Sequence, residues 1–120
     1  MFRLAMDGAP QGMAVVGLDL KFVEVNAALC AMVGRDEEWM LSHSMPDVMN
    51  PDDAEQDLAG LGALVSGSAE MQVHERRWLK SDGSELWVLN STGLMRDEEL
   101  MPVYYVSHVQ DITDAYNAKA

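Results

Sequence analysis

The sequence predicts an α+β domain in which a five-stranded antiparallel sheet carries helices packed on one face. Three observations support this prediction: two short strand patterns open the chain, helical patterns fill its middle third, and three long extended runs fill the rest. The resulting order is β-β-α-α-α-β-β-β. Helices gathered between two groups of strands are typical of an antiparallel sheet covered on one face. A chain of 120 residues has the size of one compact domain.

The first two strand patterns predict an antiparallel hairpin. Residues 13–18 form an apolar run that Asp19 closes. Residues 21–26 then alternate, with Val23 and Val25 on one side and polar or aromatic residues on the other. Because only a short turn separates the two runs, we expect them to pair directly.

The middle third begins with two short predicted helices. Residues 27–33 carry apolar side chains at helical spacing, and Gly34 ends this helix. A second helix is expected from Asp36, where acidic residues complement the positive end of the helix dipole.

The longest predicted helix follows Asn50. Asn50 suits the N-cap, Pro51 suits the first helical position, and Gly67 can end the helix. The apolar stripe expected to face the core consists of Ala54, Leu58, Leu61, Leu64 and Val65.

The last third predicts three long strands. They cover residues 71–80, 85–95 and 102–112, with turns at 81–84 and 96–100 that contain Gly, Asp and Ser or charged residues.

Charge and cysteine content limit the function classes. Twenty acidic and 8 basic residues give a formal charge of −12, which disfavours contact with nucleic acid or an anionic membrane. The chain has no apolar run of membrane-spanning length and no signal-peptide pattern, so we expect a cytoplasmic location. The single cysteine, Cys30, excludes an internal disulfide and has no His or Lys beside it in sequence, which favours a packed thiol over a nucleophile.

No pattern supports catalysis or metal binding. His43, His74 and His108 lie in different predicted elements and lack the spacing of a metal site. Asp52 and Asp53 resemble paired catalytic carboxylates, but a position at a helix N-terminus explains them. We therefore expect that the domain is not an enzyme.

Four phrases follow one another along the chain. Residues 23–30 run from a strand into a helix that Asn26 opens, and residues 34–38 contain paired glutamates after a Gly. Residues 50–53 start a helix with Pro-Asp-Asp, residues 75–87 contain an Asp-Gly hairpin, and residues 110–113 contain Asp-Ile-Thr. In this order the phrases resemble those of the PAS domain, the sensory module of bacterial signalling proteins.

The resemblance implies a cavity between sheet and helices that holds flavin, haem, a carboxylate, another metabolite, or nothing. In the light-sensing flavin subclass a reactive Cys would fall on Ser44 and a flavin-facing Asn on Val88. Haem-binding members place a His on the long helix, and residues 51–67 contain none. We therefore expect neither flavin nor haem. The family's usual Gly after the second helix is replaced by Leu41, so that corner should be tighter or differently angled.

Alternation along the strands, oriented by the resemblance, selects candidate cavity residues. The inward positions expected to contact a ligand are Val88, Asn90, Thr92 and Tyr105. Asn90 and Thr92 would be polar groups in an apolar pocket, where they either contact a ligand or bond each other, water or the backbone. Arg76 and Trp78 share a face of their strand whose direction the resemblance leaves open.

The opposite sheet face is too apolar for solvent exposure, which predicts a partner surface. Its residues are Trp87, Leu89, Tyr104 and Val106. We expect a homodimer built from this face together with residues 2–6.

The end of the last strand is the expected point of signal transfer, through Asp111 and Thr113. Thr113 is suited to cap a helix that begins near Ala115 and runs toward a downstream output domain. The alternative is that the Asp-Ile-Thr phrase only ends the strand with a turn.

These observations predict three regions: an N-terminal cap or helical segment at 1–10, the PAS domain at 11–113, and the start of a linker helix at 114–120. The predicted function is that of a sensory and dimerisation domain from a bacterial signal-transduction protein of the diguanylate cyclase, phosphodiesterase or histidine kinase type. It would bind a small metabolite between sheet and helices. One alternative is an interaction module with a filled core and no ligand. The other is a small α+β-roll enzyme of the ketosteroid-isomerase type, whose helices precede most of its strands.

Overall fold

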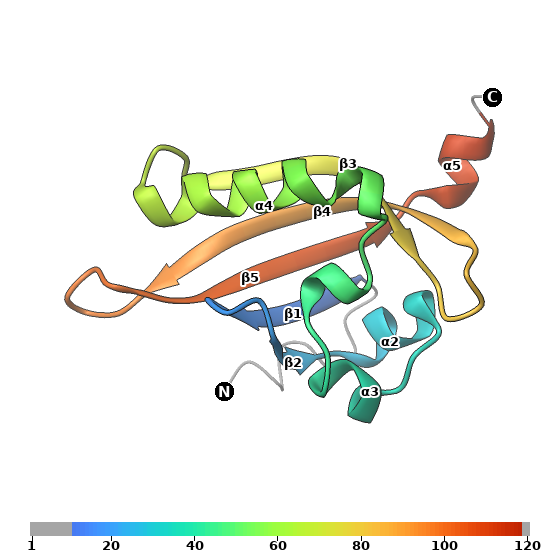
Figure 1. The fold of residues 1–120 in the computed structure, drawn as a ribbon, viewed down its shortest axis with the longest axis horizontal. Helices are drawn as coiled ribbons and strands as arrows, with labels where there is room; N and C mark the ends of the chain where they lie inside the picture. The colour runs from blue at the N-terminus through green and yellow to red at the C-terminus, as the bar shows by residue number, and fades with distance from the viewer. Residues whose placement is uncertain (1–10, 119–120) are drawn as a thin grey trace.

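A computed structural model of the chain describes residues 11–118, and a single sheet lies at its centre (Figure 1). The strands of this sheet are β1 (Gly12–Gly17), β2 (Phe22–Val25), β3 (Met71–Leu79), β4 (Glu85–Arg96) and β5 (Pro102–Asp111). Within the described residues the spatial order is β2-β1-β5-β4-β3, and every neighbouring pair is antiparallel. The predicted five-stranded antiparallel sheet is therefore confirmed.

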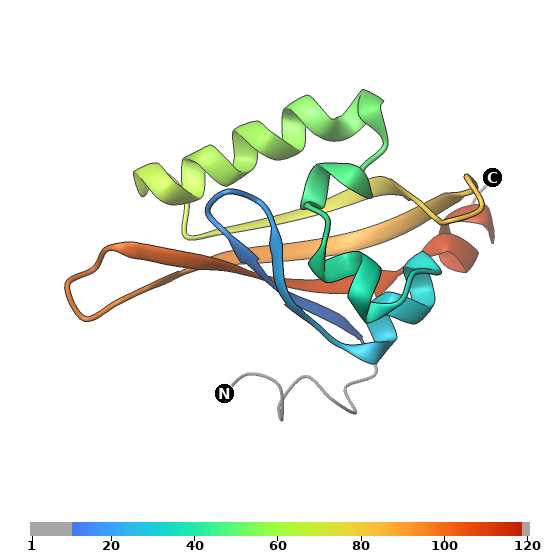
Figure 2. The same cartoon turned by 60° about the horizontal axis from the view of Figure 1, so that its bottom comes forward.

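The helices between β2 and β3 cover one face of this sheet (Figure 2). They are α2 (Ala27–Val33), α3 (Glu37–Leu41), the 3₁₀ helix η1 (Met45–Asp47) and α4 (Pro51–Ser66). A final helix, α5 (Thr113–Ala118), follows β5 at one end of the molecule. The predicted cap at 1–10 and the dimer contact at 2–6 lie outside the described residues.

Asn26 joins β2 to α2. Its Oδ1 accepts hydrogen bonds from the Leu29 N–H at 3.0 Å and the Met13 N–H at 2.9 Å, and its Nδ2 donates to the Gln11 carbonyl at 2.9 Å. The side chain is only 1% exposed. A buried amide with these bonds caps α2 and fixes the helix against β1.

The ends of α4 are those predicted. The Asn50 side chain accepts the Asp52 N–H, Pro51 begins the helix, and Gly67 ends it in the left-handed conformation with φ 82°. The short η1 was not predicted. Ser44 and Asp47 bond each other there in a capping box.

The inward face of α4 differs from the predicted stripe. Leu61 and Leu64 are buried as expected, but Leu58 and Val65 are each 40% exposed. Asp57 lies inward in place of Leu58, with a side chain only 9% exposed. The physical reason is Arg76, which lies opposite on β3 and pairs with this carboxylate.

The core fills the space between the sheet and these helices. Alternation along β4 and β5 places Leu86, Val88 and Thr92 inward with Tyr105 and Val109, as predicted. On β3 the inward row includes the fully buried Trp78 and, at even spacing beside it, Arg76, which settles the direction that the sequence left open. The buried hydrophobic residues of the core are Ala14, Val16, Phe22, Val25, Leu29, Val33, Met40, Met45, Val48, Met49, Leu61, Leu64, Trp78, Leu86, Val88, Tyr105 and Val109.

Candidate functional site

A small cavity lies between α4 and the β3–β4 half of the sheet. Its volume is about 20 Å³, which is room for roughly one water molecule. The lining residues are Met45, Met49, Asp57, Gly60, Leu61, Gln72, His74, Arg76, Asn90 and Thr92. Most of the side chains on the sheet side are polar, which distinguishes this cavity from the surrounding core.

An ion pair forms one wall of the cavity. Arg76 Nε donates a hydrogen bond to Asp57 Oδ1, and the two side chains are 16% and 9% exposed. Burial raises the pKa of the Asp57 carboxyl, while the hydrogen bond and the charge of Arg76 act in the opposite direction. Among residues 11–118, the second carboxylate oxygen, Oδ2, is buried without a hydrogen-bond partner.

The sheet supplies further polar groups to the cavity. His74 Nε2 lies 2.6 Å from Gln72 Oε1 on the same strand. Thr92 Oγ1 lies 2.9 Å from Ser107 Oγ on β5 and 3.4 Å from Asn90 Oδ1. The sequence left open whether Thr92 contacts a ligand or bonds within the protein, and Thr92 does form hydrogen bonds within the protein. Contact of Asn90 with a ligand remains a prediction.

The structure brings together two of the four predicted cavity residues. Asn90 and Thr92 line the cavity, whereas Val88 and Tyr105 face inward but belong to the packed core. The Tyr105 hydroxyl donates to the Leu61 carbonyl at 3.3 Å, and burial raises the pKa of the phenol. Tyr105 thus contacts α4 at Leu61 and is not among the residues that line the cavity.

A second ion pair attaches the start of α4 to β3. Arg77 Nη2 lies 2.8 Å from Asp53 Oδ1, and the Arg77 backbone N–H also donates to Asp53 at 3.0 Å. These bonds hold the pKa of the Asp53 carboxyl below its usual range. Neither residue lines the cavity. Asp53 thus attaches the first turn of α4 to β3.

Sequence patterns missed the charged part of the site. Asp57 and Arg76 are far apart in the chain; Arg76 lies in the hairpin phrase at 75–87, but Asp57 belongs to none of the phrases described above, so nothing in the sequence pairs the two residues. One signal was present: Asp57 lies three residues after Ala54 and four before Leu61, so it interrupts a stripe of apolar spacing. Within residues 11–118, no group of three or more His, Cys, Asp or Glu side chains is placed to hold a metal ion.

Ser44 and Val88, the positions compared above with flavin-binding members of the family, contact other residues of the protein. The Ser44 hydroxyl donates to Asp47 at 3.1 Å at the start of η1, and Val88 is fully buried in the core. Cys30 is half-buried. Burial first, and then the nearby Glu37 and Asp36 carboxylates, raise the pKa of its thiol, which disfavours the reactive thiolate.

The junction after β5 differs from the prediction in one contact. The helix begins at Thr113 and not near Ala115, and the Thr113 hydroxyl accepts the Trp87 N–H at 3.0 Å instead of capping α5. The Asp111 carboxylate accepts the Thr113 N–H at 2.9 Å. The reason is that the Ile112 N–H donates to the Trp87 carbonyl at 2.9 Å, one position beyond the last register pair of β4 and β5, which brings the Thr113 hydroxyl to the Trp87 N–H.

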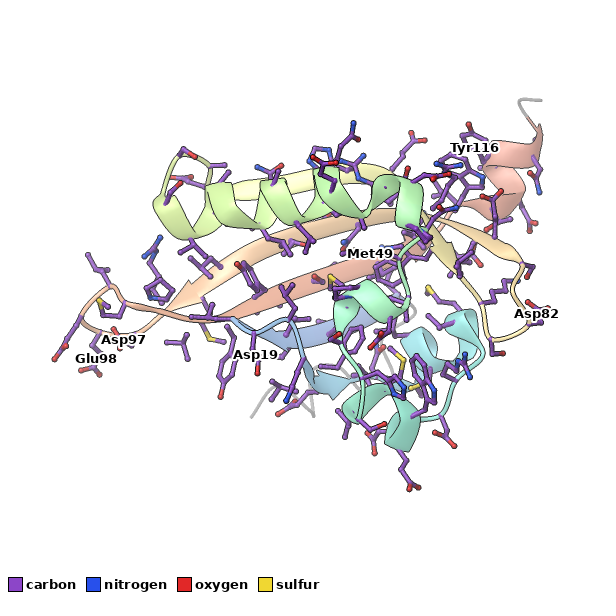
Figure 3. All side chains as sticks on the ribbon, viewed as in Figure 1. Asp19, Met49, Asp82, Asp97, Glu98 and Tyr116 are labelled. Atoms are coloured by element: carbon purple, nitrogen blue, oxygen red, sulfur yellow. The ribbon has the colours of Figure 1, made fainter. Side chains whose placement is uncertain are left out.

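Part of the outer sheet face is covered by the same chain. The Tyr116 ring of α5 stacks on Trp87 with centroids 3.7 Å apart, at the end of the molecule away from Asp97 and Glu98 (Figure 3). Leu89, Tyr104 and Val106 are half-exposed. Met71 and Val73, at outward positions of β3, are 58% and 51% exposed and extend this apolar face. Its role in a dimer remains a prediction.

The described helices, taken one by one, are too short or too polar to cross a membrane. Together, the strand order and the helices on one face define an α+β domain built on a single antiparallel sheet. A family model described as the PAS fold matches residues 6–117, and the chain belongs to this family. Membership sets aside the alternative of an α+β-roll enzyme of the ketosteroid-isomerase type.

Two curated relatives are much longer than this chain. The probable diguanylate cyclase DgcE of Escherichia coli is 29% identical over 113 residues, which are 94% of this chain and 10% of the relative. The C4-dicarboxylate transport sensor protein DctS of Rhodobacter capsulatus is 32% identical over 119 residues, which are 98% of this chain and 18% of the relative. This chain is thus similar to a signalling domain within larger proteins.

Solved structures confirm the fold. A PAS domain from Colwellia psychrerythraea superposes with a TM-score of 0.86 at 20% identity, covering 92% of this chain and 93% of the other. The PAS domain of a two-component sensor histidine kinase gives 0.75 at 20% identity over 91% of each chain. The Rhodobacter sphaeroides LOV protein gives 0.82 at 17% identity, covering 98% of this chain and 68% of the other.

Proposed function

We propose that this domain is the sensory unit of a longer bacterial signal-transduction protein of the diguanylate cyclase, phosphodiesterase or sensor kinase type. The domain itself is non-catalytic and binds a small molecule in the cavity beneath α4. Its similarity to short stretches of a probable cyclase and of a transport sensor supports the first part. A cytoplasmic location accords with its acidic composition and single cysteine.

The ion pair inside the cavity carries the ligand-binding part of this proposal. Well-packed apolar residues are often at least as stabilising as a buried ion pair, so stability alone does not require Asp57 and Arg76. Charged and polar groups converging on a concave space are typical of a ligand site. His74 and Asn90 add to this convergence.

The size of the cavity favours a second candidate, a PAS interaction module without a ligand. Room for roughly one water does not accommodate a metabolite while the side chains lie as they do. Binding requires α4 or the flexible Met45 and Met49 to move outward. The two candidates therefore differ in whether this movement occurs.

Ligand entry would reach the output domain by a shift between two packings of α4 on the sheet. The Thr92–Ser107 hydrogen bond links the cavity wall to β5. β5 then leads to Asp111 and Thr113, for which we keep the proposed role in signal transfer. A homodimer through the outer face would present one such junction from each subunit.

The test uses adjacent residues on opposite faces of β4. A calorimetric and NMR screen with small metabolites of each charge class should give at least one ligand for the wild type. Asn90→Leu should lose that ligand, and Ser91→Ala, on the outer face, should keep it. If no compound binds and native mass spectrometry finds only the polypeptide mass, the ligand-free module is the correct function.

A further inference from the structure

The cavity presents one negative and one positive group side by side. Asp57 and Arg76 both line it, and both side chains are more than four-fifths buried. Their hydrogen bond uses Oδ1 of the carboxylate, which leaves the buried Oδ2 without a partner among the described residues. A buried acceptor without a protein donor is unfavourable, so a ligand that donates to Oδ2 supplies a hydrogen bond that no described protein group supplies.

Charge complementarity narrows the class of ligand. A ligand with only carboxylates would be attracted by Arg76 but would lie against the Asp57 carboxylate. A ligand with only ammonium groups would be attracted by Asp57 but would lie against the Arg76 guanidinium. A molecule that carries both charges on neighbouring atoms places an ammonium at Asp57 and a carboxylate at Arg76, and so opposes neither group.

We propose that this cavity recognises a small zwitterion, of which an α-amino acid with a short side chain is the simplest example. This inference rests on the proposed function, because it names the ligand class of the same site. The ammonium group donates to Asp57 Oδ2, and the carboxylate accepts from the Arg76 guanidinium. The Asn90 amide and His74, which line the same wall, supply further polar contacts.

Any ligand has to displace part of the cavity lining, so the smallest ligands require the least movement. Met45, Met49 and Leu61 form the apolar part of the lining, and the two methionines have three rotatable bonds each with which to make room. Gly60 contributes no side chain where α4 passes the cavity. Short ligands such as glycine, alanine and serine should therefore bind more tightly than amino acids with large side chains.

The test compares three probes of nearly equal size on the complete chain. L-Alanine carries both charges, L-lactate replaces the ammonium by a hydroxyl, and L-alaninol replaces the carboxylate by a hydroxymethyl group. We expect L-alanine to bind at least tenfold more tightly than either of the others in NMR titrations. Glycine and L-serine should bind as L-alanine does.

Matched variants locate the interaction. Asp57→Asn and Arg76→Gln should each weaken L-alanine at least tenfold, and Asp57→Asn should weaken L-lactate much less. Asp53→Asn, which removes the neighbouring ion pair outside the cavity, should leave affinity unchanged. The comparison of probes on the wild type needs no variant, so it decides the proposal even if Asp57→Asn does not fold.

The outcomes separate this inference from the proposed function. If a carboxylate, an amine or a neutral compound binds more tightly than all three zwitterions, the zwitterion class is wrong and small-molecule sensing stands. If neither the zwitterions nor any other charge class binds, both are wrong. Equal loss of L-alanine in Asp53→Asn would also overturn the assignment, because it would indicate a general loss of structure.

Discussion

Two aspartates one helical turn apart on α4 have opposite electrostatic environments. Hydrogen bonds from Arg77 lower the pKa of Asp53, whereas burial raises the pKa of Asp57 despite the bond from Arg76. Relative to the unfolded chain, the protein therefore favours the charged form of Asp53 and disfavours the charged form of Asp57, although both are aspartates on the same helix. Because the residue type is the same, the difference follows from how deeply each carboxylate is buried.

This contrast predicts opposite pH dependences. A lowered pKa contributes stability above the unfolded value of about 3.9 that is lost as the pH falls through the folded pKa. A raised pKa works in reverse, adding stability as the pH falls through the folded pKa toward about 3.9. The deficit of Asp53→Asn should therefore shrink below about pH 4. The deficit of Asp57→Asn should grow as the pH falls from 7 to about 4.

Urea unfolding of the wild type, Asp53→Asn and Asp57→Asn between pH 3 and 7 tests these two predicted pH dependences. Deficits that change in the same direction would show that the two carboxylates do not differ in this way.

Two glycines of α4 provide a second prediction at the residue scale. A Cβ on Gly62 would meet nothing within 4 Å, whereas one on Gly60 would approach Gln72 Oε1 to 3.3 Å. Alanine is favoured over glycine in a helix by about 1 kcal/mol. Gly62→Ala should therefore raise the free energy of unfolding by about 0.5–1 kcal/mol. Gly60→Ala should gain less, because Gln72 has to shift from its contact with His74. Thermal unfolding measures both, and a larger gain for Gly60→Ala would contradict the geometry.

At the scale of elements, α4 shows what the sequence could and could not predict. Local chemistry at Asn50, Pro51 and Gly67 determines where the helix begins and ends, and these ends were predicted correctly. The inward face of α4 was not predicted correctly. Leu58 is more apolar than Asp57, and Asp57 faces inward because it pairs with Arg76 on β3. Pairing between distant residues leaves no periodic signal in the chain.

The same reasoning explains the other partial successes. Alternation along β4 correctly placed Asn90 and Thr92 inward, since period two depends only on the strand itself. Whether an inward residue lines the cavity or packs in the core depends on α4, so strand alternation alone could not separate Asn90 and Thr92 from Val88 and Tyr105. The helix η1, three residues long, is too short for a periodic pattern to reveal.

The β5–α5 junction provides a prediction about an element end. The half-buried Thr113 hydroxyl satisfies the Trp87 N–H, and loss of one such hydrogen bond costs about 1 kcal/mol. Thr113→Val should therefore lower the melting temperature by several degrees. In the full-length protein it should also alter output, because coupling energies are themselves only about 1–3 kcal/mol.

Thr113→Ser is the matched control, since it keeps the hydroxyl, and should resemble the wild type in both measurements. The proposed role in signal transfer would be wrong if Thr113→Val did not fold. It would also be wrong if Thr113→Val lowered the melting temperature as expected but left the output unchanged. Asp111→Ala, which removes the acceptor for the Thr113 N–H, should behave as Thr113→Val does.

At the scale of the whole molecule, the outer sheet face predicts a homodimer. Val73 on this face is 51% exposed, and Val65 on α4 is exposed to a similar extent on another surface. Light scattering at tens of micromolar should give a dimer for the wild type and for Val65→Glu. It should give a monomer for Val73→Glu, because a charge in an apolar contact is costly. A monomeric wild type would rule out this dimer.

Absorbance provides a second prediction for the whole protein. With Ser44 bonded to Asp47 and Val88 in the core, the positions matched to flavin contacts have other roles. The purified protein should be colourless. A visible absorbance band that stays with the protein through gel filtration would contradict the expectation of neither flavin nor haem.

The central position of β5 has a consequence for how the chain acquires its structure. β1 and β5 are neighbours in the sheet, and Gly12 pairs with Val109. During synthesis, β1 and β2 emerge before β5 as a local hairpin, and one edge of β1 has no partner until β5 leaves the ribosome. Contacts between residues far apart in sequence form slowly, and an open strand edge invites pairing with other chains. The sheet is therefore complete only after β5 has been made, and a chain cut short before β5 would expose that edge.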